Sequence, residues 1–162
     1  MDNESPFISK SSVPQFELHF ENEKLKNVTV ESIFQLIRHI KDPEHPYSLE
    51  ELNIVALEDI RIYLLENTEV ACKSGSPISV IEIVFTPTVP HCSMAGIIGL
   101  SIHFQLQKYI KNFWIDVKIK KDTHSTYQAL NKQLSDKDRR MAAFDNEDMV
   151  NLIQQCIGSL DE

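Results

Sequence analysis

A strand, a proline-rich loop and a long apolar helix follow one another between residues 78 and 106, and this order decides the fold. The stretch reads Ile78-Ser-Val-Ile-Glu-Ile-Val-Phe85, then Thr86-Pro-Thr-Val-Pro-His-Cys92, then Ser93-Met-Ala-Gly-Ile-Ile-Gly-Leu-Ser-Ile-His-Phe-Gln-Leu106. The first part is rich in β-branched and aromatic residues, which favour a strand. The last part predicts a buried helix that starts at Ser93 or Met94 and runs to about residue 110.

Alternating apolar residues on both sides of this stretch predict two more strands. They are Ile60, Ile62 and Leu64 before it, and Ile115, Val117 and Ile119 after it. The first two strands are joined locally and are expected to pair antiparallel. A strand, helix, strand passage favours parallel pairing of the second and third strands with a right-handed crossover. The loops 87–92 and 121–126 would then leave the sheet at the same edge and could share one pocket.

Helical patterns flank the sheet. The first contains Val30, Ile33, Phe34, Ile37 and Ile40, and it is expected to stop at Asp42-Pro43 because the residue before proline avoids the helical region. Ser48 and Glu51 have the spacing of a capping box. After residue 126 come a pattern from Tyr127, a segment from Ser135, and a last helix capped by Asn146. The last helix has an apolar face of Met149, Ile153, Cys156, Ile157 and Leu160.

These elements predict an α/β (α+β) fold, a two-layer sandwich with a small mixed sheet and the order α-β-β-α-β-α. At 162 residues and 42% hydrophobic, the chain is long enough for one domain with a real core. We assign residues 28–162 to that domain. Residues 1–27 are polar and without periodicity, and they are interpreted as a flexible N-terminal tail.

Charge and targeting signals narrow the class of protein. The net charge of -8 argues against a nucleic-acid partner, which Lys and Arg would have to bind through phosphates. The N-terminus shows no secretory signal, and the longest apolar stretch falls short of the roughly 20 residues that a bilayer span needs. We therefore expect a cytoplasmic protein, with the nucleus also open, that binds proteins and neither nucleic acid nor membrane.

Cys92 is the candidate functional residue, because it stands directly before the predicted helix. The first N–H groups of a helix lack internal partners and the macrodipole adds positive charge there, so a thiol at this place has a lowered pKa. The alternative is that Cys92 is a small buried hydrophobic residue with a structural role only, as most free cysteines are. Its neighbours Pro90, His91 and Ser93 are turn and cap residues, which favours the functional reading.

The other two cysteines are interpreted differently. Cys156 lies on the apolar stripe of the last helix and is expected to be structural, while Cys72 lies in a polar loop and is expected to be incidental. An iron-sulfur or zinc site that one chain forms by itself normally uses about four Cys or His ligands, two of them closely spaced in the sequence. Three cysteines with no C-x-x-C pair make this chain a poor host for a permanent cluster.

Two histidines could assist Cys92. His91 adjoins it, and His124 follows the third predicted strand. A cysteine with a histidine could be a nucleophile with its base, or two ligands of a metal. Each histidine could equally be a loop residue that caps backbone groups.

A pair of glycines and a basic cluster are two further patterns in the sequence. Gly96 and Gly99 have the G-x-x-G spacing of an RNA-binding KH loop, but they lie inside a helical pattern between isoleucines. They are expected to let the helix approach the sheet closely. A basic cluster near the end of the chain is a candidate docking site for an acidic partner, and it consists of Lys132, Lys137, Arg139 and Arg140.

Three stretches together resemble a known family. They are Asp42-Pro-Glu-His-Pro-Tyr-Ser-Leu-Glu-Glu-Leu-Asn-Ile-Val55, Phe85-Thr-Pro-Thr-Val-Pro-His-Cys-Ser-Met-Ala95, and Thr123-His-Ser-Thr126 with Asn131-Lys-Gln-Leu-Ser-Asp-Lys-Asp-Arg139. Over residues 29–160 the chain is similar to the mitotic-spindle-associated MMXD-subunit family, small components of the cytosolic iron-sulfur assembly targeting complex.

The resemblance implies a role in handing iron-sulfur clusters to apo-proteins, beside a WD-repeat propeller and a HEAT-repeat scaffold. It implies that Cys92 is the reactive cysteine, a ligand of a transient cluster shared with a partner, and that no cluster is held permanently. Some members of the family form domain-swapped homodimers. This chain departs from the family where Asp122 replaces a glycine and where Arg140 replaces an apolar residue.

Two other classes of function stay open from the residues alone. One is a cysteine-dependent hydrolase or transferase that uses Cys92 with His124 as base, although no nucleophile-elbow glycines accompany the cysteine. The other is a plain scaffold with a structural Cys92. The resemblance favours an assembly component that is not an enzyme.

Overall fold

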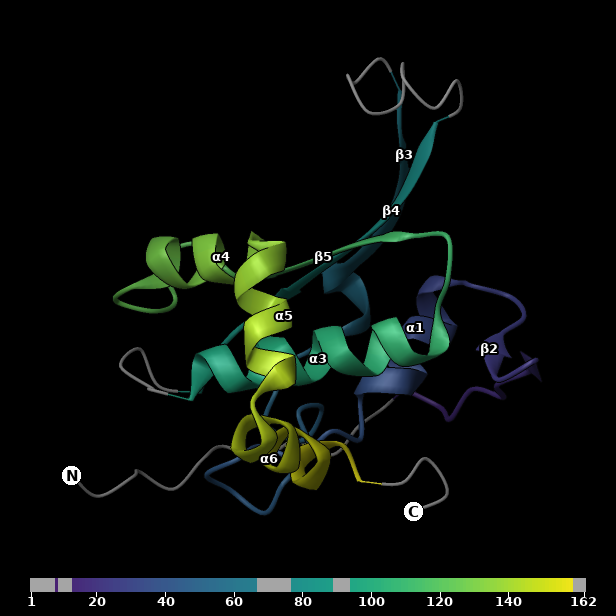
Figure 1. Ribbon diagram of the computed structural model, residues 1–162. Helices are drawn as coiled ribbons and strands as arrows, with labels where there is room; N and C mark the ends of the chain where they lie inside the picture. The colour runs from purple at the N-terminus through teal and green to yellow at the C-terminus, as the bar shows by residue number, and fades with distance from the viewer. Residues whose placement is uncertain (1–7, 9–12, 67–76, 89–93, 159–162) are drawn as a thin grey trace.

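The computed structural model describes residues 8, 13–66, 77–88 and 94–158. Figure 1 shows their elements in chain order. The elements are β1 (Phe20–Glu21), β2 (Lys24–Leu25), α1 (Val30–Ile37), the 3₁₀ turn η1 (Leu57–Asp59), β3 (Ile60–Leu65), β4 (Ile78–Phe85), α3 (Ala95–Tyr109), β5 (Trp114–Ile119), α4 (Tyr127–Ser135), α5 (Lys137–Asp145) and α6 (Glu147–Ile157). The mixed α/β class predicted from the sequence is confirmed.

Strands β3, β4 and β5 form a mixed three-stranded sheet in that order. β3 pairs antiparallel with β4, with Ile60 opposite Ile83. β4 pairs parallel with β5, with Phe85 opposite Ile119. Both pairings were predicted, since a hairpin joins strands antiparallel and a helical crossover returns the chain in parallel.

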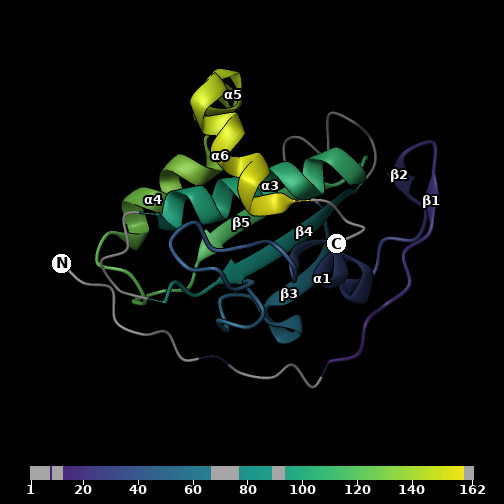
Figure 2. The same cartoon turned by 90° about the horizontal axis from the view of Figure 1, so that it is seen from below.

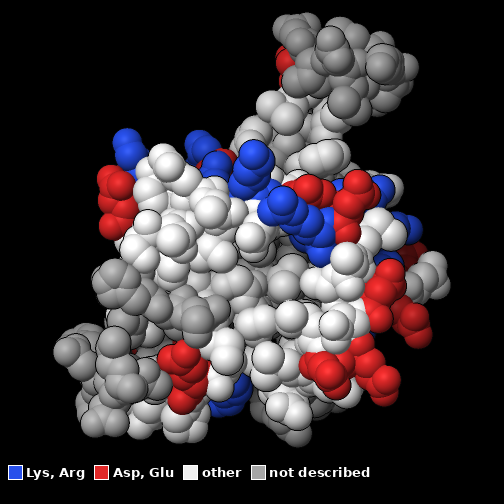
Figure 3. All heavy atoms as spheres, turned by 60° about the vertical axis from the view of Figure 1, so that its left-hand side comes forward, with Lys and Arg blue, Asp and Glu red and all other residues white. Residues whose placement is uncertain are grey.

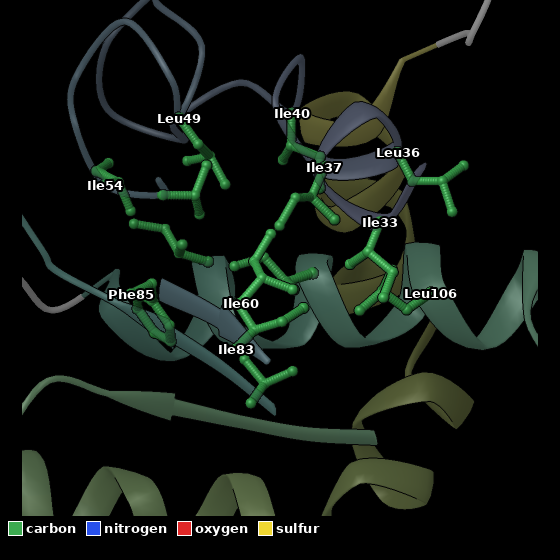
Figure 4. Packing of buried hydrophobic residues seen from close by; sticks show 14 of the residues in the cluster. Ile33, Leu36, Ile37, Ile40, Leu49, Ile54, Ile60, Ile83, Phe85 and Leu106 are labelled. Carbon is green, nitrogen blue, oxygen red and sulfur yellow. The ribbon is translucent and has the colours of Figure 1, made fainter. Parts of the chain in front are cut away.

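The core lies between this sheet and the helices α1 and α3. The inward residues of β4 are fully buried, and they come from every second position: Ile81, Ile83 and Phe85. Figure 4 shows Ile83 and Phe85 in one cluster with side chains of α1 and with Leu49 and Ile54. Burial of a side chain of this size contributes about 1.5–3 kcal/mol, so the sheet face contributes substantially to stability.

Helix α1 starts as its sequence predicts and ends earlier. Thr29 and Ser32 form a reciprocal capping box at its start. Its last residue is Ile37, not a residue next to Asp42-Pro43, although Ile40 is still buried. The chain leaves the helix there because the Ile40 carbonyl accepts a hydrogen bond from Leu49 N–H (2.8 Å). A bond to a distant segment thus replaces the next helical turn.

The predicted capping box at Ser48 is present. Glu51 N–H donates to the Ser48 hydroxyl (3.2 Å), and Ser48 N–H donates to the Glu51 carboxylate (3.1 Å). The segment forms a turn, with Leu52 N–H bonded to the Ser48 carbonyl, and it leads into β3 through η1.

Part of the segment assigned to a tail is folded against the domain. Residues 20–25 form the β1–β2 hairpin, and Phe16 N–H donates to the side chain of Gln35 (2.9 Å). Arg38 binds the carbonyls of Val13 and Pro14. Contacts with the domain are therefore already present from residue 13 of the described chain, before the expected boundary at residue 27. Hydrogen bonds to Arg38 and Gln35 attach this segment, together with apolar residues that pack on the core without a helical or strand period.

The β3–β4 pair projects from the body (Figure 1). On the outer face of the sheet, the Glu82 carboxylate binds Arg61 (2.8 Å) and Lys118 (3.2 Å). Lys118 also lies 3.6 Å from Asp116. Four alternating charges thus lie side by side across three strands, next to the buried apolar side chain of Val80.

Three short helices end the described chain. Asp136 caps α5 by accepting hydrogen bonds from the N–H groups of Asp138 and Arg139. The predicted start of this segment at Ser135 is wrong, because Ser135 is the last residue of α4. Asn146 caps α6 through Met149 N–H, as predicted. Helix α6 packs on α3 and buries Ile153 and Cys156 (Figure 2).

The two glycines of α3 face helix α4, not the sheet. A Cβ atom built on Gly99 would lie 2.7 Å from the side chain of Leu134, and one on Gly96 would lie 3.8 Å from Leu130. The expectation that the two glycines let α3 approach the sheet closely is therefore wrong. Gly99 lets α4 pack closely on α3, because a methyl group there would occupy the space of buried Leu134.

The two glycines offer a matched pair for measurement. Both Gly99→Ala and Gly96→Ala gain helix propensity, about 1 kcal/mol each. Only Gly99→Ala adds overpacking, which costs about 1–3 kcal/mol. We expect Gly96→Ala to be as stable as the parent or more so, and Gly99→Ala to be less stable than Gly96→Ala by about 1–3 kcal/mol in urea denaturation. Equal stability of the two variants would show that Leu134 moves aside freely.

Candidate functional site

Cys92, His91 and Cys72 lie outside the described residues. For Cys92 and His91, the structure describes the strand before them and the helix after them. β4 ends at Phe85 and α3 begins at Ala95, as the predicted strand, loop and helix require. Pro87 is buried and Thr88 is half-buried. The candidate site is therefore bounded by the end of a central strand and the start of the longest described helix.

The N-terminus of α3 has the electrostatic character that the sequence predicts. Met94 is the N-cap residue, and no side chain of the described residues makes a cap hydrogen bond there. Its first turn contains no acidic residue. Because the first N–H groups of any helix lack intrahelical partners, this end presents uncompensated partial positive charge.

The loops after β4 and β5 leave the sheet at one edge. Lys120 N–H donates to the Phe85 carbonyl (2.9 Å), which continues the parallel ladder by one bond. On the other side, Thr86 N–H donates to the Ile54 carbonyl (2.9 Å). The two loops therefore start from neighbouring positions, which supports the predicted proximity of residues 87–92 and 121–126.

His124 is buried, and its Nδ1 atom acts as an acceptor. Thr126 N–H donates to it over 3.1 Å, and the Thr126 hydroxyl lies 3.2 Å from the same atom. A neutral imidazole that accepts at Nδ1 carries its proton on Nε2, so it has no second lone pair for a thiol proton or a metal. This geometry favours a histidine that caps the start of α4 and disfavours the Cys92–His124 enzyme.

The turn before His124 uses the conformation that the family glycine would supply. Asp122 has φ 62°, in the left-handed region. Thr123 closes the turn by donating its N–H (3.2 Å) and its hydroxyl (2.6 Å) to the Lys120 carbonyl. Aspartate is among the few non-glycine residues that visit this region, so the turn keeps its shape at a small cost in strain.

Asn131 has a structural role that the sequence alone did not reveal. It lies on α4, where its side-chain oxygen accepts from Ile119 N–H (2.7 Å) and its amide nitrogen donates to the Ile119 carbonyl (3.2 Å). The side chain thus takes the place of a neighbouring strand at the free edge of β5. It ties α4, and with it the turn at His124, to the sheet.

The four basic residues of the predicted partner site have different surroundings. Lys132 and Arg139 are exposed, and Arg139 lies 3.7 Å from the Asp136 carboxylate. Lys137 and Arg140 line a pocket on α5 with residues of α3 and β5. The docking of an acidic partner on these residues stays a prediction.

Cys156 is buried at 4% exposure on α6, and this burial raises the pKa of its thiol. Both features agree with the structural role expected from the apolar stripe. Among residues 8, 13–66, 77–88 and 94–158, no three His, Cys, Asp or Glu side chains gather as metal ligands. None of the described helices has the length and hydropathy to cross a membrane.

Comparison with known proteins identifies the family. No family model matches the chain. The chain is 39% identical over 162 residues to "Cytosolic iron-sulfur assembly component 2B" of Mus musculus, which covers 98% of this chain and 92% of the relative. The protein of the same name from Dictyostelium discoideum is 40% identical over 158 residues, 96% of this chain and 86% of the relative.

A third relative carries the family name itself. MIP18 family protein galla-2 of Drosophila melanogaster is 44% identical over 128 residues, 78% of this chain and 74% of the relative. The family predicted from the stretches around Tyr47, Cys92 and His124 is confirmed: the chain belongs to the MIP18 family, together with proteins named as cytosolic iron-sulfur assembly components.

Proposed function

We propose that this chain is a component of cytosolic iron-sulfur protein assembly that helps deliver clusters to apo-proteins. The observation that carries the proposal is similarity over almost the whole chain to relatives named as assembly components. Local similarity around one motif would have supported a shared fold only, but here the sheet, the helices around it and the loop with Cys92 all lie in the aligned region. The role is one of assembly, not catalysis.

Cys92 is the proposed reactive residue. It stands three residues before Ala95, the first residue of α3, whose start has no acidic side chain to oppose the helix field. A helix N-terminus is one of the environments that lower the pKa of a cysteine from about 8.5, so more of the thiol is present as thiolate at neutral pH. The thiolate is the form that binds iron.

The cluster is the cargo of this protein and is shared with a partner. Cys156 is a poor ligand, because it lies on the buried face of α6 and the pKa of its thiol is raised. His124 is also a poor ligand while Nδ1 accepts from Thr126. Cys92 would therefore contribute one ligand of about four, and the rest must come from other chains. Incomplete ligation suits a carrier that has to release its cargo.

The partners follow from the same reasoning. The proposed complex contains a WD-repeat propeller subunit and a HEAT-repeat scaffold, and it receives apo iron-sulfur proteins as clients. The helices 126–157 and the outer face of the sheet are the surfaces available for these contacts. The proposed location is the cytoplasm, with the nucleus as a second compartment where clients are loaded.

Depletion of the chain from its own cells tests the function. We expect incorporation of radioactive iron into cytosolic and nuclear iron-sulfur enzymes to fall severalfold, and re-expression of the chain to restore it. Mitochondrial iron-sulfur enzymes serve as the control, because their clusters are assembled in a separate compartment. Unchanged iron incorporation into every cytosolic client after depletion would contradict the proposal.

A further inference from the structure

A pocket lies between α3, β5 and α5. Its volume is about 210 Å³, and it is lined by His103, Gln107, Phe113, Trp114, Ile115, Lys137 and Arg140. Figure 1 shows α5 crossing α3. Helix α5 thus brings two cations to a hollow whose other walls come from the consecutive elements α3 and β5.

The cations of the pocket are available for an anion. Lys137 is exposed and makes no ion pair or hydrogen bond with the described residues. Arg140 donates one bond to the Leu134 carbonyl (2.7 Å), which leaves most of its five donors for another acceptor. Two carboxylates, Asp136 and Asp116, act on Arg140 electrostatically, but Asp136 also caps α5 and Asp116 also pairs with Lys118. No carboxylate lines the pocket.

The floor of the pocket holds a polar group without a partner. His103 is 5% exposed, and neither ring nitrogen makes a hydrogen bond with the described residues. The side chain of Gln107 and the backbone of Ile115 lie close enough to the ring to raise its pKa slightly. Burial, and after it the charge of Arg140, has the larger effect and lowers the pKa of His103 to about 4, so the ring is neutral at pH 7 and adds no charge to the pocket.

Both ring nitrogens of His103 lie below the pocket surface, so the donors that can reach a ligand are those of Lys137 and Arg140. An acceptor group in the pocket would be bound by these two cations at the same time. A carboxylate has two oxygens and up to four acceptor directions, which suits this set of donors.

The surroundings of the pocket point to a protein as the source of the carboxylate. Trp114 is 58% exposed at its wall, and Met141 is 52% exposed on the same helix as Lys137. Exposed aromatic residues and methionine are enriched where proteins bind one another. On the face drawn in Figure 3, most Lys and Arg side chains lie in the upper part, with acidic side chains beside them. In the pocket itself, Lys137 and Arg140 have no carboxylate in the lining with them, so an acidic partner finds local complementarity there.

We propose that this pocket binds an acidic segment of a partner protein, with Asp or Glu carboxylates held by Lys137 and Arg140 and an apolar neighbour of the carboxylate packed on Trp114. The site is independent of Cys92 and does not rest on the role in cluster delivery. It uses two of the four basic residues near the end of the chain and assigns no contact to Lys132 or Arg139.

Trp114 is the only tryptophan of the chain, so its fluorescence reports on the pocket directly. The probe is the peptide acetyl-Glu-Leu-Glu amide, which has two carboxylates and no terminal charges, titrated into the full-length protein at low salt. We expect a saturable change in Trp114 emission that weakens as salt is added. The neutral isostere acetyl-Gln-Leu-Gln amide is expected to cause no such change.

Matched charge removals locate the site. Lys137→Gln and Arg140→Gln are each expected to weaken binding about tenfold, since each loses a charge-assisted contact. Lys132→Gln and Arg139→Gln remove the same charge outside the pocket and are expected to bind as the parent does. Lys137→Gln is the decisive variant, because Lys137 makes no contact with the described residues that folding would need; circular dichroism confirms its fold.

Three results would overturn the proposal. Equal weakening by Lys132→Gln and Lys137→Gln would mean that only net charge matters. Binding of succinate as tightly as the peptide would assign the pocket to a small dicarboxylate, not to a protein segment. Absence of any change in Trp114 emission at millimolar peptide would show that the pocket does not take this chemistry.

Discussion

Replacing Cys92 with alanine is expected to abolish iron loading of client enzymes while the fold and the partner complex stay intact. The small size of the change explains why the fold should be kept, because alanine lacks only the sulfur atom of cysteine. The described core is formed by the sheet face of β4 and by α1 and α3. The proposed chemistry, in contrast, depends on one thiolate at the start of α3, and alanine cannot bind iron.

Two measurements check this prediction. In cells depleted of the chain, Cys92→Ala should restore less than a tenth of the client iron incorporation that the parent restores, about the loss expected when a sole ligand is removed. In anaerobic reconstitution with iron and sulfide, cluster absorbance should require both the propeller subunit and Cys92.

Controls come from the same chain. Cys72→Ser removes another thiol and should behave as the parent does, and partner pull-down with Cys92→Ala should be unchanged. Normal client loading by Cys92→Ala would refute the role of the thiol and leave the plain scaffold as the better account. Loss of partner binding together with client loading would show that the residue acts through structure.

Arg38→Met is expected to lower the free energy of unfolding by about 3–5 kcal/mol, the usual cost of breaking a buried ion pair from one side. Arg38 is fully buried, and its guanidinium binds the Glu50 carboxylate at two points, 2.8 Å and 2.6 Å. It also donates to the carbonyls of Val13 and Pro14. Methionine fills similar space but leaves these acceptors and a carboxylate that is only 12% exposed without their donor.

Urea denaturation with a second arginine as control tests this prediction. Arg61 also pairs with a glutamate, but its side chain is 66% exposed, so Arg61→Met should change stability far less. The double variant Arg38→Met/Glu50→Leu should regain much of the loss, because it removes the unpaired charge as well. A loss from Arg38→Met no larger than that from Arg61→Met would contradict the proposed role of Arg38.

The sequence predicted most of the elements because their signals are local. The alternation of Ile81, Ile83 and Phe85 specifies a strand with one buried face, and the apolar run after Met94 specifies a helix. Antiparallel and parallel pairing then followed from the lengths of the connections. The family followed from motifs, which similarity to named relatives confirmed.

Other features were not predictable because they depend on which distant residues meet. Nothing in the pattern of α1 distinguishes buried Arg38 from a solvent-facing arginine, since its partners Val13 and Glu50 lie on either side of the helix in sequence. The spacing of Gly99 in the sequence is the same whether a sheet or a helix packs against it. Only the position of Leu134 in the folded chain shows that a helix packs there.

The sequence by itself determined the mixed fold, the position of Cys92 ahead of a helix and the membership of the MIP18 family, because strand alternation, helix periodicity and motifs are properties of short stretches. Tertiary structure alone decided which groups meet. It gave His124 its partner at Nδ1, placed Asn131 at the edge of β5, and brought Lys137 and Arg140 to one pocket with residues of α3 and β5. These contacts join residues on different elements, and packing of the whole chain sets them.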